Sequence, residues 1–154
     1  MNRLLLLGLV VFLAAAGPRA AARSVEGVEL PGTVTARDGA TLRLHGAGVR
    51  TKFFFDIYVG ALYLPRTGQA LQAIRESDQP GRIEMHFLYD EVTREQLAEA
   101  WRSGFRANNP RELHARIADR LERFVALFPA AAGGDTFAME YIPGQPVGDV
   151  LRGE

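Results

Sequence analysis

The chain has 154 residues, equal numbers of basic and acidic side chains, 18 of each, and no cysteine. The lack of cysteine excludes disulfides and thiol nucleophiles, and the balanced charge gives no electrostatic footprint for nucleic acid. This length suits one domain with a single hydrophobic core.

Residues 1–22 are predicted to be a cleavable secretory signal. Arg3 precedes an apolar run over residues 4–16, and Ala20 and Ala22 form the small-x-small exit that signal peptidase recognises. The apolar run is too short for a membrane-spanning helix, which needs about 20 apolar residues. We therefore expect cleavage after Ala22 and export, most simply to a bacterial periplasm.

Residues 23–154 are then expected to form the mature domain. Cleavage removes Arg3 and Arg19, which leaves 16 basic against 18 acidic side chains, a net charge of −2. No internal repeat or linker divides this segment, and we expect neither nucleic-acid binding nor stable membrane insertion once the signal is gone. The oligomeric state is left open by the sequence.

The first part of the mature chain is predicted to be strands. Residues 28–36 and 42–44 are short strand patterns separated by Arg37-Asp38-Gly39, and Asp-Gly between such segments is a hairpin signal. Residues 53–64 are apolar in both alternating sets, which predicts a strand covered on both faces at the centre of the sheet. Gly60 within it predicts a close approach to the backbone.

Residues 67–76 are predicted to form a short helix with Leu71 and Ile74 facing inward. Residues 83–89 then alternate apolar and polar side chains, which predicts a half-buried strand with an aromatic-rich face.

Two helices and a last strand complete the expected elements. Thr93 begins a Thr-Arg-Glu-Gln capping box, Pro110 starts the second helix, and residues 137–141 form the final strand. The side chains expected to face inward are Leu97, Ala100, Trp101 and Phe105 on the first helix, and Leu113, Ile117, Leu121, Phe124, Val125 and Phe128 on the second. The order β-β-β-α-β-α-α-β predicts an α+β fold with an antiparallel sheet and helices packed on one face.

Common catalytic and metal-binding patterns are not found in the sequence. His45, His86 and His114 lie on separate elements without ligand spacing, so we expect no metal site. No Gly-x-Ser-x-Gly motif is present, and no cofactor is expected.

One arginine stands out because of its surroundings. Arg50 lies between Gly46-Ala47-Gly48 and the most apolar strand, which carries Tyr58 and Tyr63 on opposite faces, while Tyr89 ends the next long strand. An arginine at the edge of an aromatic, apolar slot can hold a carboxylate or a phenolate with two charge-assisted hydrogen bonds. Alternatively, Arg50 pairs with a surface carboxylate and the tyrosines simply pack.

The block from Gly46 to Pro65, with its Gly-Ala-Gly-Val-Arg start, resembles the chalcone isomerase superfamily, in particular its bacterial chalcone isomerase-like branch. The similarity runs roughly from Leu30 to Gly153. Further support comes from Phe87-Leu88-Tyr89 leading into the Thr93 helix with Trp101 and Gly104-Phe105, from the helix end Phe124 to Phe128, and from the Gly134-Asp135 and Tyr141-Ile142-Pro143-Gly144 segments.

The resemblance implies an open-faced β-sandwich, in which a large antiparallel sheet packs against helices with a cleft between them. Such relatives continue beyond the Pro143-Gly144 turn with another strand and a helix. We therefore expect these C-terminal elements to be missing from a chain that stops at Glu154, whether that end is natural or the end of a fragment.

The resemblance also implies which residues bind a ligand, namely Arg50, Tyr58, Tyr89 and Gln96. In plant members the arginine after the glycine block holds an anionic ligand, and Arg50 matches it. Tyr58 stands where those enzymes have a threonine that helps polarise the ketone, and Gln96 stands near the asparagine that they have early in the following helix. Tyr89 corresponds to a tyrosine that orders a catalytic water. If the protein is catalytic, Arg50, Tyr58 and Tyr89 would carry the reaction.

Three functions follow as hypotheses. The favoured one is a non-catalytic binder of a small apolar carboxylate, such as a fatty acid, or of a phenolic ligand. The second is an isomerase, an intramolecular lyase of chalcone isomerase type, against which the changed residues Tyr58 and Gln96 argue. The third is an envelope interaction module without a ligand.

Overall fold

The computed structural model describes residues 21–145 and 151–153, so the predicted signal lies outside the described residues except for its last two. The elements are β1 (Arg23–Val25), β2 (Val28–Leu30), β3 (Thr33–Thr35), β4 (Thr41–Lys52), β5 (Phe55–Leu64), α1 (Leu71–Glu76), β6 (Gly81–Phe87), β7 (Glu91–Val92), α2 (Arg94–Asn108), α3 (Arg111–Val125), β8 (Ala131–Ala132), β9 (Thr136–Tyr141) and β10 (Leu151–Gly153).

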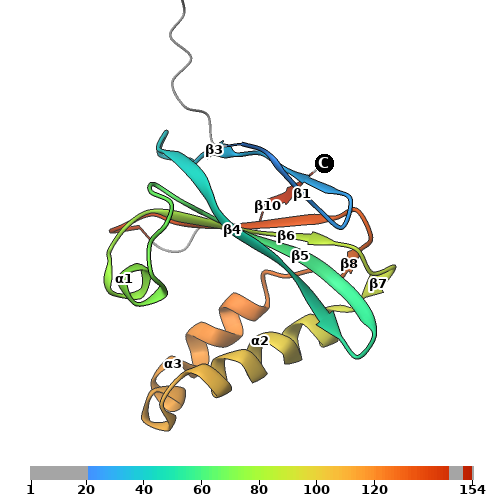
Figure 1. Cartoon of the computed structure of the whole chain (residues 1–154). Helices are drawn as coiled ribbons and strands as arrows, with labels where there is room; N and C mark the ends of the chain where they lie inside the picture. The colour runs from blue at the N-terminus through green and yellow to red at the C-terminus, as the bar shows by residue number, and fades with distance from the viewer. Residues whose placement is uncertain (1–20, 146–150, 154) are drawn as a thin grey trace, which may run out of the picture.

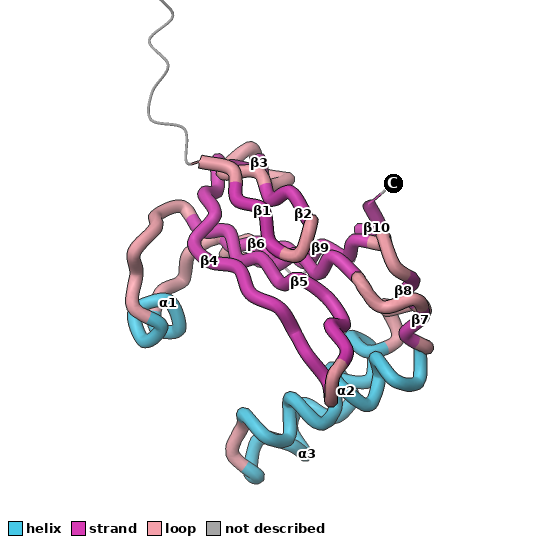
Figure 2. The backbone as a smooth tube through the Cα atoms, turned by 45° about the vertical axis from the view of Figure 1, so that its right-hand side comes forward, coloured by secondary structure: helices cyan, strands magenta, loops and turns pink. Residues whose placement is uncertain are grey.

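The centre of the fold is a six-stranded sheet in the order β10-β9-β6-β5-β4-β3, in which every neighbouring pair is antiparallel. Helices α2 and α3 lie under one face of this sheet, and the β1–β2 hairpin lies over the other (Figures 1 and 2). The predicted α+β class, with helices on one face of an antiparallel sheet, is therefore confirmed. Among the described residues, no helix has the length and hydropathy needed to cross a membrane.

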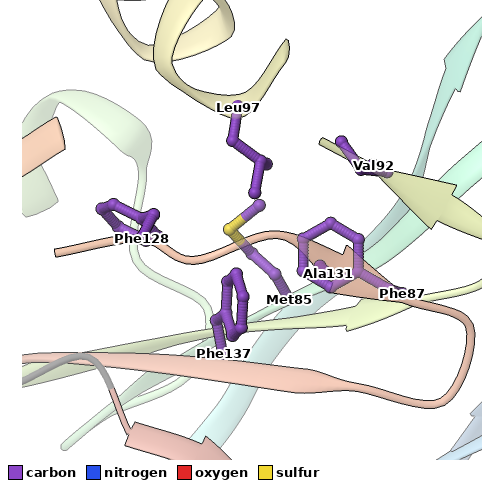
Figure 3. Close-up of a cluster of buried hydrophobic side chains, with 7 residues drawn as sticks. All are labelled: Met85, Phe87, Val92, Leu97, Phe128, Ala131 and Phe137. Atoms are coloured by element: carbon purple, nitrogen blue, oxygen red, sulfur yellow. The ribbon is translucent and has the colours of Figure 1, made fainter. Parts of the chain in front are cut away.

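Strand alternation gives the sheet two differently packed faces. On the helix-facing side, the sheet contributes Met85 and Phe87 of β6 and Phe137 of β9. These side chains form one core with Leu97 of α2 and with Phe128 (Figure 3). The opposite face has its own core under the β1–β2 hairpin, made by Leu30, Ala36, Leu42, Val59, Ala61 and Tyr63. The sheet therefore holds two apolar cores that do not share side chains.

The strand predicted over residues 53–64 begins only at Phe55. Strand β4 continues to Lys52, and Phe53 and Phe54 form the turn of the β4–β5 hairpin, with Phe53 in the left-handed region at φ 57°. The prediction that Phe53 starts a covered strand was wrong, because an apolar run has the same pattern whether it is buried or exposed at a hairpin tip. The central position of β5, between β4 and β6, is as predicted.

The start of one helix and two inward-facing positions were also predicted wrongly. Helix α1 begins at Leu71 rather than at residue 67, since Gly68 has φ 72° and breaks the helical path before it. Leu71 is 71% exposed and does not face inward. On α2, Ala98 is buried while Ala100 is exposed. The short α1 therefore adds little to the core.

A strand beyond the Pro143-Gly144 turn, expected to be missing, is present as β10, which pairs with β9 through Leu151 and Ala138. The hairpin predicted around Asp38-Gly39 is confirmed as β3–β4, with Gly39 at φ 86°.

The aromatic core on the helix-facing side predicts a large effect of one substitution. Phe137 is fully buried, so Phe137→Ala should lower the free energy of unfolding by about 3–5 kcal/mol, through lost burial and the cavity that remains. Urea denaturation measures the change. Phe54→Ala is the matched control, because Phe54 is 96% exposed, and a comparable loss in both variants would contradict the packing described.

Candidate functional site

The β4–β5 register places Arg50 directly opposite Tyr58. Tyr58 in turn pairs with Phe87 on β6, and their ring centroids are 5.6 Å apart. Since Phe87 belongs to the core between the sheet and the helices, this row of residues shares the helix-facing side of the sheet. Arg50 and Tyr58, which are eight positions apart in sequence, therefore lie side by side on one face.

The charge of Arg50 acts on the Tyr58 phenol. Burial raises the pKa of the Tyr58 phenol above 10, and the positive charge of Arg50 counteracts part of that rise. Tyr58 is thus a neutral hydrogen-bond donor at physiological pH, beside an exposed guanidinium. Together they can bind one anionic oxygen-containing group, because each carries N–H or O–H donors and they are cross-strand neighbours on one face.

Beside this pair, the sheet carries a strip without side chains. Gly48 pairs with Gly60, and Gly46 pairs with Leu62. A Cβ atom added at Gly46 or Gly48 would meet no atom within 4 Å, whereas at Gly60 it would lie 3.6 Å from the ring of Tyr58. Tyr58 therefore packs over Gly60, as predicted for a glycine inside this strand, and β4 offers a smooth, open surface.

An apolar row continues from this strip across three strands. Leu62, Ile83 and Met139 are neighbours in the β5–β6 and β6–β9 registers and lie on the helix-facing side. Ile83 is 46% exposed although β6 is in the middle of the sheet. The helices therefore cover one end of this face and leave the other uncovered. We refer to the three glycines and these three residues as the apolar strip.

Tyr89 and Gln96, the other two predicted ligand residues, have different contacts. The ring of Tyr89 packs edge-on against Phe55 at 5.4 Å, and its backbone N–H donates to the Ile57 carbonyl. The Gln96 side-chain oxygen accepts from the Thr93 N–H, and the Gln96 N–H donates to the Thr93 hydroxyl, completing the predicted capping box. Their roles in ligand binding stay predictions.

One polar group on the helix side was not singled out from the sequence. The indole N–H of Trp101 on α2 is buried and has no acceptor among the described residues. Its ring packs against Phe124 and Phe128 at about 5 Å. A buried tryptophan usually has an acceptor for its N–H. Trp101 is predicted to face inward on its helix, so the sequence did contain a signal for a buried donor that a bound polar group could use.

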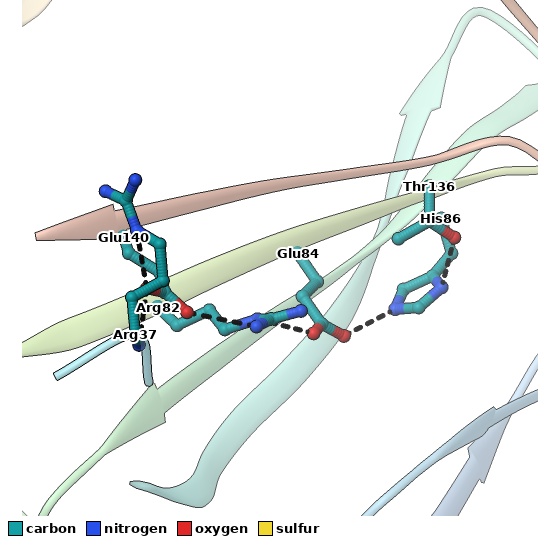
Figure 4. A network of polar contacts seen from close by, with 6 residues as sticks. All are labelled: Arg37, Arg82, Glu84, His86, Thr136 and Glu140. Carbon is teal, nitrogen blue, oxygen red and sulfur yellow. Dashed lines mark hydrogen bonds and ion pairs between the residues drawn. The ribbon is translucent and has the colours of Figure 1, made fainter. Parts of the chain in front are cut away.

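The opposite face of the sheet holds a second polar cluster, which is closed on itself (Figure 4). Arg82 donates to Glu84 and to Glu140 at 2.7 and 3.0 Å, and Arg37 donates to the other Glu140 oxygen. His86 lies between Glu84 and the Thr136 hydroxyl, 3.0 Å from each. These groups satisfy one another, so the cluster stabilises the sheet.

Glu84 titrates differently from an ordinary glutamate because of this cluster. Burial alone would raise its pKa, but the hydrogen bond with His86 and the positive charge of Arg82 outweigh it and hold the pKa below 4.5. Within the described residues, no group of three or more histidine, aspartate or glutamate side chains is arranged to hold a metal ion.

Comparison with known proteins gives the family. A family model described as chalcone isomerase-like matches residues 22–154. The chain belongs to the chalcone isomerase-like family. Among solved structures, a fatty-acid binding protein of Arabidopsis thaliana aligns with a TM-score of 0.48 and 15% identity, over 75% of this chain and 75% of that chain. No curated protein matches the sequence.

Membership of the chalcone isomerase-like family confirms the resemblance seen in the sequence, and the mixed fold with its large antiparallel sheet agrees with it. The residue that the resemblance ranks first, Arg50, lies on the sheet face beneath which the helices pack. Tyr58 joins it through the register of β4 and β5.

The Glu84 cluster predicts a pH-dependent stability. Since the folded-state pKa is lowered, the ionised carboxylate stabilises the fold above its ordinary pKa, and this contribution is lost as the pH falls through the folded value. Glu84→Gln should lower the free energy of unfolding by about 1.5–3 kcal/mol at about pH 7, the usual size for hydrogen bonds to a charged group, with a smaller difference from the wild type at about pH 3. Urea denaturation at both pH values measures it. A difference that does not shrink on acidification would contradict the charge-based account.

Proposed function

We propose that this chalcone isomerase-like protein is exported and binds a small apolar carboxylate, of fatty-acid type, without transforming it. The carboxylate would be held by Arg50 and Tyr58, and the hydrocarbon part would lie along the apolar strip. The observation that carries the proposal is the combination of a cation and a neutral phenol with an uncovered apolar surface on one sheet face.

The polar end of the site suits an anion. The guanidinium of Arg50 offers a two-pronged, charge-assisted contact, and the protonated Tyr58 adds one donor while its ring shields the contact from water. Burial keeps that phenol protonated. A carboxylate fits both donors because its two oxygens accept several hydrogen bonds.

The apolar end suits a hydrocarbon chain. Gly46 stands four positions before Arg50, which corresponds to roughly 13 Å along a strand. Over that length β4 presents glycines, and Leu62, Ile83 and Met139 continue the surface beyond it. Burial of this surface by a ligand would contribute about 25 cal/mol for each Å² removed from water.

The absence of catalysis is proposed from the site residues. A chalcone isomerase-type reaction must orient a phenolate and stabilise a developing enolate. Tyr58 and Gln96 differ from the threonine and asparagine that the plant enzymes use for this, and the Gln96 oxygen is held by the Thr93 N–H. These differences favour binding over turnover.

Export to a periplasm is proposed from the signal pattern of residues 1–22. The direct check is the intact mass of the protein recovered from an expressing bacterium. We expect a chain that begins at Arg23, and recovery of the uncleaved chain from the cytoplasm would contradict export.

Ligand binding is tested on the purified protein by native mass spectrometry and lipid extraction. We expect a co-purifying acid of lipid size, and added fatty acids should raise the melting temperature. Arg50→Ala should weaken fatty-acid binding by roughly ten- to a hundredfold, since it removes hydrogen bonds to a charged group. Arg66→Ala, which changes an exposed arginine after β5, is the matched control and should bind normally.

Other outcomes would select the other functions. Turnover of a chalcone, followed by its absorbance, that disappears in Arg50→Ala would establish an isomerase. If extraction yields no acid and fatty acids cause no thermal shift, the interaction module without a ligand is the better account.

The glycine strip gives a second, independent test. Gly48 has ordinary strand geometry and open space around its position, so Gly48→Val should fold with unchanged or slightly higher stability, since valine favours strands. Its side chain would occupy the surface on which the hydrocarbon is proposed to lie. We expect weaker fatty-acid binding at full stability, measured by calorimetric titration and thermal melting. Unchanged affinity would place the ligand elsewhere.

A further inference from the structure

The end of the β4–β5 hairpin exposes three consecutive phenylalanines. Phe53, Phe54 and Phe55 are 83%, 96% and 54% exposed. Phe55 contacts the ring of Tyr89, itself 36% exposed, so the exposed rings continue onto the neighbouring segment. We call these four residues the aromatic tip. Single exposed apolar residues are common, but a contiguous group of large rings marks an interaction surface.

The shape of the hairpin narrows the choice of partner. Strand β5 pairs with β6 from Tyr58 onward, and the Ile57 carbonyl still accepts from the Leu88 and Tyr89 N–H groups. The hairpin end from Thr51 to Asp56 therefore extends beyond the backbone pairing with the neighbouring chain, as Figure 1 shows at the lower end of the hairpin. The rings of Phe53 and Phe54 are almost completely surrounded by solvent. A convex protein surface could cover only one side of such a projection, whereas a fluid bilayer can surround it.

The basic side chains near the aromatic tip agree with a phospholipid surface as the partner. The Lys52 ammonium lies 6.0 Å from the Phe53 ring, and Arg50 is two residues earlier on the same strand. A cation directly behind inserted rings can reach lipid phosphates. The acidic side chain of Asp56 on the same hairpin has a partner within the hairpin, because it accepts a hydrogen bond from the Thr51 hydroxyl at 2.8 Å.

Three acidic residues moderate this charge. Asp56 is exposed within the hairpin end, and Asp90 and Glu91 are exposed next to Tyr89, so the surroundings of the aromatic tip are not strongly positive. Insertion of the rings, rather than charge, must therefore supply most of the affinity. The polar backbone of the turn limits insertion to the interface, because unpaired backbone groups are costly in hydrocarbon.

We propose that the aromatic tip docks the protein on the surface of a phospholipid bilayer, with Phe53 and Phe54 at the boundary between headgroups and acyl chains. Lys52 then lies at the level of the phosphates. Docking in this way brings the Arg50 end of the apolar strip close to the membrane. It does not depend on what the strip binds, and an Arg50→Ala variant that loses fatty acid would still dock through its phenylalanines.

The test is flotation of the purified protein with vesicles of phosphatidylethanolamine and phosphatidylglycerol. The wild type should float with the vesicles, and Phe53→Ser combined with Phe54→Ser should weaken the partition by roughly a hundredfold, through loss of two inserted rings. Leu71→Ser is the matched control, since Leu71 is 71% exposed on α1, which is remote from the tip in both views. It should float normally, and all variants should melt like the wild type.

A fluorescent reporter identifies the inserted group. Phe54→Trp should float as the wild type does, and its added emission should shift to shorter wavelength when vesicles are present. The proposal is overturned if the wild type does not float, if the double serine variant floats equally well, or if the new tryptophan keeps its emission in water. Self-association that depends on Phe54, without vesicle binding, would instead identify a protein partner and would also overturn it.

Discussion

The register between β4 and β5 is the constraint on which the site depends. It places Arg50 opposite Tyr58 and Gly48 opposite Gly60. A shift by one residue would turn the affected side chains to the other face of the sheet, separating the guanidinium from the phenol. Irregularities in the pairing at Leu44/Gly46 and at Arg50/Thr51 bound the regular segment that holds this arrangement.

The two faces of the sheet have different tasks because they are covered differently. The β1–β2 hairpin and the Arg82–Glu84–Glu140 ion pairs close one face, and the charged groups of that cluster satisfy one another. On the other face the helices cover the Phe87 end and leave Ile83 exposed. A fold of the chalcone isomerase-like family thus combines a fixed core with an open apolar surface on the same face.

The sequence predicted features with local causes and missed those with non-local ones. The Asp38-Gly39 turn and the Thr93 capping box were predictable because a few adjacent residues determine them. The phenylalanines at positions 53–55 were misassigned in part, because apolar alternation does not distinguish a covered strand from an exposed tip. The pairing of Arg50 with Tyr58 depends on strand register, so the residues alone could place them in one slot only as a hypothesis, which the family resemblance strengthened.

The central claim is that Arg50 and Tyr58 act together on one carboxylate, and a double-mutant cycle tests it most directly. Fatty-acid affinity would be measured by calorimetry for the wild type, Arg50→Ala, Tyr58→Phe and the double variant. Groups that bind the same anion should show non-additive effects, with a coupling of about 0.5–3 kcal/mol. Strictly additive losses, or full affinity in both single variants, would contradict the account.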